Sequence, residues 1–126
     1  MQVSPRILLV DDDSNILTIY SKRFAAAGFE TVTARNGEDG LRMAGKHVPD
    51  LILLDLMMPR LDGFETLARL KEHMELQHIP VVILTSLSDR RDIDRCNELG
   101  CAAYLIKTQV TPEDVVRKAK EILRMT

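Results

Sequence analysis

Several side chains that could act as metal ligands or nucleophiles stand directly after short apolar runs in this sequence. Asp55 follows residues 51–54 (LILL), and Asp11 and Asp12 follow residues 6–10 (RILLV). A carboxylate is rarely left in a protein core without a partner, but at the carboxyl end of a buried parallel strand it lies where ligands bind. An isolated aspartate in such a place most often caps a turn, so the rest of the chain decides between the two interpretations.

Two further polar residues end apolar runs later in the chain. Thr85 follows residues 80–84 (PVVIL), and Lys107 follows residues 102–106 (AAYLI). Besides a metal ion, the oxygens of a phosphoryl group need a hydroxyl or amide donor and a cation. Together with the acids, these two residues indicate phosphoryl chemistry, in which Asp55 would be the nucleophile that forms an aspartyl phosphate.

The acidic cluster indicates a divalent metal ion. Carboxylates that lie close together raise one another's pKa, and a hard divalent cation relieves that repulsion. Mg²⁺ commonly takes one or two carboxylates, a carbonyl and several waters. Asp11, Asp12 and Asp55 are therefore candidate ligands of Mg²⁺ or Mn²⁺, whereas Asp13 or Ser14 is expected to cap the helix that follows.

These residues must be positioned by strands and helices that alternate along the chain. The expected strands are residues 6–10, 30–34, 51–54, 80–84 and 102–106. Apolar residues at helical spacing follow each strand, in residues 17–27, 38–47, 64–74, 89–100 and 115–122. This alternation predicts an α/β fold with a doubly wound five-stranded parallel sheet and helices on both faces. Because residues 30–34 (ETVTA) alternate in polarity, as an edge strand does, the expected flavodoxin-like order is 2-1-3-4-5.

The strand order predicts where the polar residues meet. In an open α/β sheet, ligands bind outside the carboxyl ends of the strands, where the chain order reverses. Here that position lies between the first and third strands. The acids, the hydroxyl of Thr85 and the ammonium of Lys107 would gather there.

Composition narrows the class of protein. The 126 residues are enough for one domain, 45% are hydrophobic and 29% are charged, and the net charge is -2. No excess of basic residues favours nucleic acid or an anionic membrane as a partner. The apolar runs are about five residues long, far below the ~18 needed to cross a bilayer, so a cytoplasmic location is expected. Cys96 and Cys101 lack metal-ligand spacing and are expected to be small buried residues.

Four motifs in this order carry a resemblance to a known family. They are the acidic cluster in LLVDDD, the segment DLMMPRLDG, the strand that ends in Thr85, and YLIK. With these motifs, residues 6–123 resemble the receiver domain of bacterial two-component response regulators. The chain is thus expected to be a single receiver domain over residues 1–126.

The resemblance implies a role for each site residue. Asp55 is similar to the phosphoacceptor of the family, Asp12 to the direct Mg²⁺ ligand, and Asp11 to a ligand that acts mainly through water. The backbone carbonyl of Met57 would complete the protein's share of the metal shell. Thr85 and Lys107 are similar to the residues that grip the phosphoryl group.

The resemblance also implies a switch and its partners. Tyr104 is similar to the aromatic residue that swings inward when the threonine moves toward the phosphate. The phosphoryl source would be a histidine kinase, a phosphotransfer protein or a small acyl phosphate. The output would be a change in the face formed by the fourth helix, fifth strand and fifth helix, which binds a downstream protein. Such a protein is not an enzyme in the usual sense, although it promotes its own phosphorylation and dephosphorylation, and it is expected to be a monomer or weak homodimer.

The sequence departs from the family in one motif. Most receivers have a proline after the lysine, usually with a cis bond, but Thr108 follows Lys107 here. A cis bond before a residue other than proline costs about 3–4 kcal/mol, so we expect a trans bond and a rebuilt loop before Thr111. No segment with an output function follows the last helix, which leaves open a free single domain or a fragment of a longer regulator.

The residues two positions after Asp55 and Thr85 predict how fast the phosphoryl group would be lost. Met57 and Leu87 are both bulky and apolar, so neither can orient water for attack on the phosphorus. We therefore expect a slow intrinsic loss of the phosphoryl group.

Two other functions fit parts of the sequence. Asp11 and Asp13 have the DxD spacing of a haloacid-dehalogenase-like phosphatase, but Asn15 stands where that family prefers Thr or Val. A receiver-like binding module that signals without phosphate is the second alternative, and the missing proline after Lys107 is compatible with it. Uptake of a phosphoryl group from acetyl phosphate would separate these functions.

Overall fold

Five parallel strands form one sheet in the order β2-β1-β3-β4-β5 in the computed structural model of the protein, which describes residues 4–125. The strands are β1 (Arg6–Val10), β2 (Glu30–Ala34), β3 (Leu51–Leu54), β4 (Val81–Thr85) and β5 (Ala103–Ile106). The helices are α1 (Ser14–Ala26), α2 (Gly37–His47), α3 (Gly63–Glu72), α4 (Arg90–Leu99) and α5 (Pro112–Ile122), with a short 3₁₀ helix, η1, at Lys107–Gln109. The predicted flavodoxin-like α/β fold and its strand order are confirmed. None of the helices in the described residues has the length and apolar character that a membrane span requires.

The place of each strand in the sheet follows from its side chains. Every residue of β3 and β4 is buried, and each of these strands pairs with a neighbour on both sides. β2 lies at the edge next to β1, and its Glu30 and Thr33 are exposed. A strand covered on both faces needs apolar residues throughout, whereas an edge strand tolerates polar ones.

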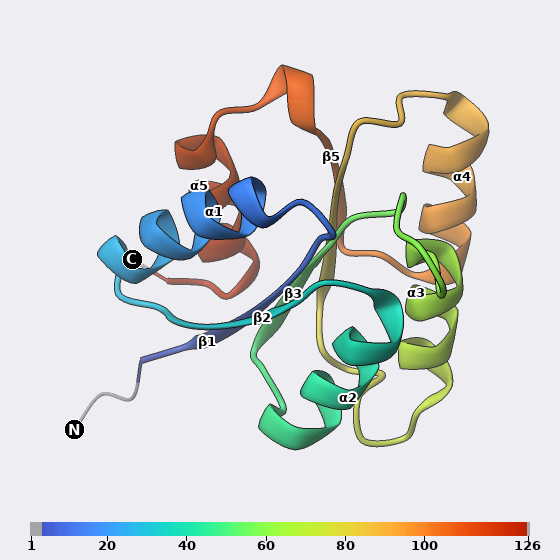
Figure 1. Cartoon of the computed structure of the whole chain (residues 1–126), viewed down its shortest axis with the longest axis horizontal. Coiled ribbons are helices and arrows are strands. Elements are labelled where there is room, and N and C mark those ends of the chain that lie inside the picture. Colours follow the sequence, from blue (N-terminus) through green and yellow to red (C-terminus); the bar gives the residue numbers. More distant parts are fainter. Residues whose placement is uncertain (1–3, 126) are drawn as a thin grey trace.

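Helices cover both faces of the sheet and enclose two hydrophobic cores (Figure 1). α1 and α5 lie on one face, and α2, α3 and α4 lie on the other. Alternate residues of β1 point to opposite sides of the sheet. Ile7 and Leu9 therefore belong to the core under α1 and α5, and Leu8 and Val10 belong to the core under α2, α3 and α4. The sheet is therefore held from both sides, and its carboxyl edge is left for the site.

Most element limits agree with the sequence prediction within one residue. Pro80 and Ala102 were expected to begin strands but lie just before β4 and β5. Each still bonds to a neighbouring strand: the Ile52 N–H donates to the Pro80 carbonyl at 3.0 Å, and the Ala102 N–H donates to the Val81 carbonyl at 2.8 Å.

α3 ends earlier than its apolar spacing predicted. Its last helical residue is Glu72, and His73 already has an extended backbone with ψ of 120°. The assignment of Met74 to the apolar stripe is therefore wrong, because the chain has left the helix there and the residue is 85% exposed. Leu76 and Ile79, in the following segment, fill the core instead.

α4 is only loosely buried. Of its three apolar residues, Cys96 is fully buried, while Ile93 and Leu99 are half-buried. Gly100 ends the helix with φ of +94°, a conformation that favours glycine. Cys101 follows this turn and is also half-buried, so the expectation of two buried cysteines is confirmed for Cys96 and wrong for Cys101. Burial raises the pKa of the Cys96 thiol to about 12.

Candidate functional site

Two of the three acids are fixed by hydrogen bonds that extend the strands. The Asp11 N–H donates to the Ala34 carbonyl at 3.1 Å, and the Asp55 N–H donates to the Val10 carbonyl at 3.0 Å. These bonds hold each aspartate one position beyond the end of its strand, at the carboxyl edge of the sheet. Both residues are buried, with exposed fractions of 4% for Asp11 and 5% for Asp55.

The three carboxylates converge at this edge. Asp11, Asp12 and Asp55 each offer an oxygen, and these atoms all lie within 4.8 Å of one another. Asp12 is exposed, so the cluster is reached from solvent on its side. Oxygen donors at this spacing fit a hard cation such as Mg²⁺ or Mn²⁺. Asp13 is not part of the cluster: its Oδ1 accepts the Asn15 N–H at 2.9 Å and caps α1, as one of the two predicted caps.

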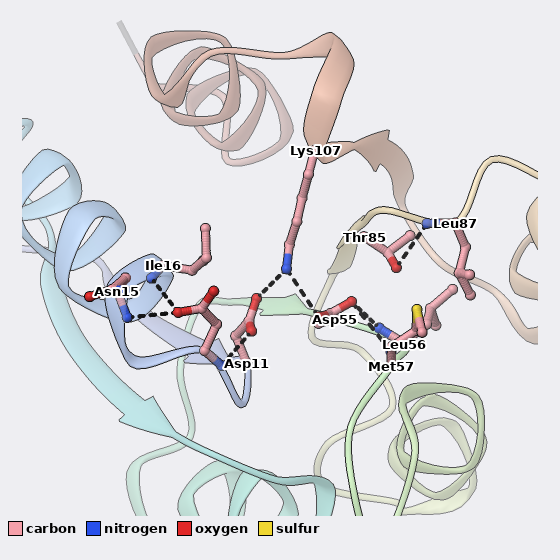
Figure 2. A network of polar contacts seen from close by, with 10 residues as sticks. Asp11, Asn15, Ile16, Asp55, Leu56, Met57, Thr85, Leu87 and Lys107 are labelled. Carbon is pink, nitrogen blue, oxygen red and sulfur yellow. Dashed lines mark hydrogen bonds and ion pairs between the residues drawn. The ribbon is translucent and has the colours of Figure 1, made fainter.

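Lys107 reaches two of these acids from the end of β5, at the edge of the sheet (Figure 2). Its Nζ donates to Asp11 Oδ2 at 2.8 Å and to Asp55 Oδ2 at 3.1 Å. Lys107 follows β5 as the first residue of η1, and its side chain is 18% exposed. The ammonium is therefore the counter-ion of a partly buried pair of carboxylates.

Burial and the neighbouring groups both shift the pKa values of Asp11 and Lys107. Burial raises the pKa of Asp11, and the charge of Asp55 adds to that effect, although the hydrogen bonds from Lys107 and from the Asp13 N–H oppose it. For Lys107, burial alone would lower the pKa, but the attraction of the two acids outweighs burial and the pKa is raised. The two directions are consistent because Lys107 has two anionic partners, whereas Asp11 has one cation and lies beside other carboxylates. The site therefore favours a bound cation.

The Asp55 carboxylate has a different partner on each oxygen. Oδ1 accepts the Leu56 N–H at 2.7 Å and the Met57 N–H at 3.4 Å, and Oδ2 accepts from Lys107. The side chain is thus held between the backbone of the β3–α3 loop and the ammonium. Met57 is 57% exposed, so the loop lies at the surface beside the acids.

Thr85 lies on the side of Asp55 away from Asp11 (Figure 2). It is the last residue of β4 and is fully buried, and its Oγ1 accepts the Leu87 N–H at 3.4 Å. Tyr104 reaches the same loop from β5, because its hydroxyl donates to the Leu87 carbonyl at 2.8 Å. Burial raises the pKa of this tyrosine to about 12. Thr85 and Tyr104 are thus connected through the backbone of Leu87.

The loop after Lys107 has the trans geometry that the sequence predicted. No peptide bond in residues 4–125 is cis, which includes the bond between Lys107 and Thr108. The chain instead forms η1 and then enters α5 through a capping box. In that box the Asp114 N–H donates to Thr111 Oγ1 at 3.1 Å, and the Thr111 N–H donates to Asp114 Oδ2 at 2.9 Å.

Sequence reasoning missed a glycine that holds the β3–α3 loop in place. The Gly63 N–H donates to the Leu56 carbonyl at 3.0 Å. A Cβ at Gly63 would lie 2.2 Å from the Asp55 carbonyl oxygen, so only glycine allows this approach. The Asp-Gly pair at positions 62 and 63 signalled a turn but not this close packing on the end of β3.

A groove runs from the acids over the two neighbouring loops. It has a volume of about 540 Å³ and extends from Asp12 past Met57 and Met58 to Phe64 and Leu87. Most of these side chains are apolar, so the surface beside the carboxylates is not itself acidic. The exposed acid at its edge is the point from which a ligand would enter.

Comparison with known proteins identifies the family. The sequence matches the model of the response regulator receiver domain over residues 7–120. The chain belongs to this family. The polar-differentiation response regulator DivK of Brucella anthropi is 36% identical over 106 residues, which cover 84% of this chain and 86% of DivK.

Solved structures of receivers have the same architecture. A putative response regulator from Chloroflexus aurantiacus aligns with a TM-score of 0.90 at 29% identity, covering 97% of this chain and 99% of the other. The chemotaxis protein CheY4 of Vibrio cholerae aligns with a TM-score of 0.89 at 26% identity, covering 95% and 99%. The receiver resemblance predicted from four motifs is therefore confirmed, and the protein is a response regulator domain of two-component signalling. The family match does not favour either of the two alternative functions.

Proposed function

We propose that the protein is a signalling switch that accepts a phosphoryl group on Asp55 in a reaction that requires Mg²⁺ or Mn²⁺. The observation that carries this proposal is the sharing of Lys107 between Asp11 and Asp55 beside the exposed Asp12. A nucleophilic carboxylate, its counter-ion and further oxygen donors lie together at one solvent-accessible edge. A purely structural ion pair would not need the third acid.

Asp55 would attack phosphorus in line with the leaving group. A bond forms between a carboxylate oxygen and phosphorus, while the bond from phosphorus to the donor's imidazole nitrogen or acyl oxygen breaks, and the electron pair leaves with the donor. When bound by Asp11, Asp12, Asp55 and the Met57 carbonyl, the metal ion would offset the repulsion between the carboxylate and the phosphoryl oxygens.

Lys107 and Thr85 would hold the transferred group. The ammonium of Lys107 already contacts Asp55 Oδ2 and can pair with a phosphoryl oxygen bound next to it. Thr85 Oγ1 accepts a bond from Leu87, an arrangement that leaves the hydroxyl proton for a phosphoryl oxygen. A shift of Thr85 toward the phosphoryl group would pull on the Leu87 backbone and, through it, on Tyr104.

The proposed output is a change in the face formed by α4, β5 and α5. Tyr104 belongs to β5 and is bonded to the loop that precedes α4, so it couples the site to this face. Phosphorylation would shift the equilibrium between two arrangements by its different contacts in each. The partners would be a histidine kinase or phosphotransfer protein and a downstream protein, in the cytoplasm, without direct binding of nucleic acid or membrane. The protein would act as a monomer or weak homodimer.

This chemistry differs from that of an enzyme that turns over a separate substrate. The residues of the site promote transfer to, and loss from, the protein's own Asp55. The released donor is an ordinary product, but the phosphoryl group stays on the protein until water removes it.

Incubation with acetyl phosphate and Mg²⁺ tests the proposal. Intact mass spectrometry should show the gain of one phosphoryl group, and mapping of the acid-labile site should place it on Asp55. Asp55→Asn should abolish the gain, and chelation of the metal should do the same to the wild type. A gain that survives Asp55→Asn and disappears with Asp11→Asn would favour a phosphatase-like nucleophile at position 11 and contradict the proposal.

A further inference from the structure

The first residue of α2 lies against the loop that carries the proposed metal site. A Cβ at Gly37 would lie 2.2 Å from Thr66 Oγ1 and 2.4 Å from the Leu61 carbonyl oxygen. Ordinary van der Waals contacts of a Cβ begin near 3.4 Å. The backbone of α2 can therefore approach the β3–α3 loop this closely only because residue 37 has no side chain.

The atoms that a Cβ at Gly37 would contact cannot move aside easily. Thr66 is 1% exposed, and its hydroxyl donates to the Asp62 carbonyl at 2.7 Å. The other atom is a backbone carbonyl, which has no rotamer to change. The same loop is tied at its two ends, because the Gly63 N–H donates to the Leu56 carbonyl at 3.0 Å. A push on Leu61 would thus be transmitted along a short, closed loop.

Two glycines of α2 pack closely against neighbouring elements and a third does not. A Cβ at Gly40 would lie 3.1 Å from Val10 Cγ1, at the end of the strand that leads to Asp11. A Cβ at Gly45 would meet nothing within 4 Å. The close approach is therefore a property of the first turn of α2, which packs against the β3–α3 loop and the end of β1.

We propose that Gly37 is a positioning residue for the phosphorylation site. Its missing side chain lets α2 support the Leu61 carbonyl, and this support holds the β3–α3 loop so that Met57 and Asp55 keep their places toward the metal ion. The inference rests on the proposed function, because it assigns the Met57 carbonyl to the metal shell. It adds α2, which contributes no ligand, to the elements that determine metal affinity.

Gly37→Ala should weaken Mg²⁺ binding and slow phosphorylation. Relief of the contact with the Leu61 carbonyl requires a shift of about 1 Å, and a misplacement of that size can cost roughly a hundredfold in rate. We expect the dissociation constant for Mg²⁺, measured by isothermal titration calorimetry, to rise about tenfold. We expect the rate with acetyl phosphate to fall roughly ten- to a hundredfold when measured at the same Mg²⁺ concentration.

Gly45→Ala is the matched control on the same helix. Its Cβ meets open space, so it should keep wild-type Mg²⁺ affinity and phosphorylation rate, and its thermal midpoint should stay the same or rise. If Gly37→Ala lowers the thermal midpoint but binds Mg²⁺ and reacts like the wild type at a temperature where it is fully folded, Gly37 is only structural and the inference is overturned. Wild-type protein that binds Mg²⁺ but takes up no phosphoryl group would contradict the proposed function instead.

A second variant keeps the test valid if Gly37→Ala does not fold. Leu61→Gly loosens the loop at the same contact without introducing a clash, because it removes the side chain whose Cβ would lie 3.0 Å from a Cβ at position 37. We expect it to raise the Mg²⁺ dissociation constant about three- to tenfold through the added freedom of the backbone. An unchanged constant in folded Leu61→Gly protein would also overturn the inference.

Discussion

Lys107 Nζ lies 2.8 Å from Asp11 Oδ2 and 3.1 Å from Asp55 Oδ2, so two buried carboxylates share one ammonium. Two carboxylates this close repel each other, and a cation between them reduces that repulsion. The candidate metal ligand Asp11 and the proposed phosphoacceptor Asp55 are thus held in place by a residue that reaches them from the far edge of the sheet. This arrangement predicts opposite stability effects for changes to the lysine and to the acids.

Lys107→Met should destabilise the protein when Mg²⁺ is absent. The variant leaves two buried carboxylates without their cation, and we expect a loss of about 2 kcal/mol in the free energy of unfolding. This is less than the 3–5 kcal/mol typical of fully buried pairs, because water can reach the site. Urea denaturation should show the loss, and millimolar Mg²⁺ should restore most of it in the variant.

The free energy of unfolding at alkaline pH provides a test of this ion pair. The pKa of Lys107 is raised in the folded protein above its ordinary value of 10.5, so its stabilising contribution is present below that pH and is lost as the pH rises through the folded pKa. The gap between wild type and Lys107→Met should therefore be constant near neutrality and close above pH 10.5. Lys118→Met removes an exposed pair with Glu121 and should change stability by less than about 0.5 kcal/mol. A loss of the same size in both variants would contradict the argument.

Asp11→Asn should stabilise the protein at neutral pH without metal. Burial raises the pKa of Asp11, so the ionised side chain is less favourable in the folded than in the unfolded state. The penalty is absent at low pH and grows as the pH rises from the ordinary aspartate pKa of 3.8 through the folded pKa of Asp11. We expect a gain of roughly 1 kcal/mol, a few degrees in the thermal midpoint, that shrinks as the pH falls toward 4.

The metal dependence of the same variant checks the cause of the gain. Mg²⁺ should raise the thermal midpoint of the wild type and have a much smaller effect on Asp11→Asn, because one oxygen anion of the cluster is lost. A variant that is less stable than the wild type at pH 7 would show that the bond to Lys107 outweighs the cost of burial.

The fold and the members of the site could be predicted from the sequence because both depend on local patterns. Apolar runs that end in Asp11, Asp55, Thr85 or Lys107 mark strand ends, and the mixed polarity of residues 30–34 marks an edge. Parallel strands then bring their ends together whatever the details of packing. The family match over residues 7–120 confirms the receiver resemblance.

Contacts that depend on the relative placement of elements could not be predicted. Glycine lowers helix propensity at both position 40 and position 45, yet only Gly40 packs against a strand. The bond from Tyr104 to the Leu87 carbonyl depends on the shape of a loop, which polarity does not encode. Met74 fitted the apolar spacing of α3 but lies beyond the point where the helix ends.

Tyr104→Phe should weaken the connection between β5 and the loop before α4. The variant removes the bond to the Leu87 carbonyl and should cost about 1 kcal/mol. The folded pKa of about 12 lies above the ordinary value of 10.0, so the tyrosine stabilises the fold below pH 10 and loses that contribution as the pH rises toward 12. The wild type should therefore lose stability more steeply than Tyr104→Phe between these values, as measured by urea denaturation. Parallel curves would contradict the assignment of this burial effect to Tyr104.

The phosphorylated protein should lose its phosphoryl group slowly, because apolar side chains stand where a water-orienting group would be needed. Met57 and Leu87 both line the groove beside Asp12, and neither can accept or donate a strong hydrogen bond to an attacking water. Met57→Asn introduces an amide at this place and should shorten the half-life roughly tenfold. The half-life is measured by intact mass after removal of acetyl phosphate, with Met74→Asn as the control at a residue that is 85% exposed and follows α3. A half-life of seconds for the wild type, or equal half-lives for wild type and Met57→Asn, would show that these two side chains do not limit the access of water to the phosphorus.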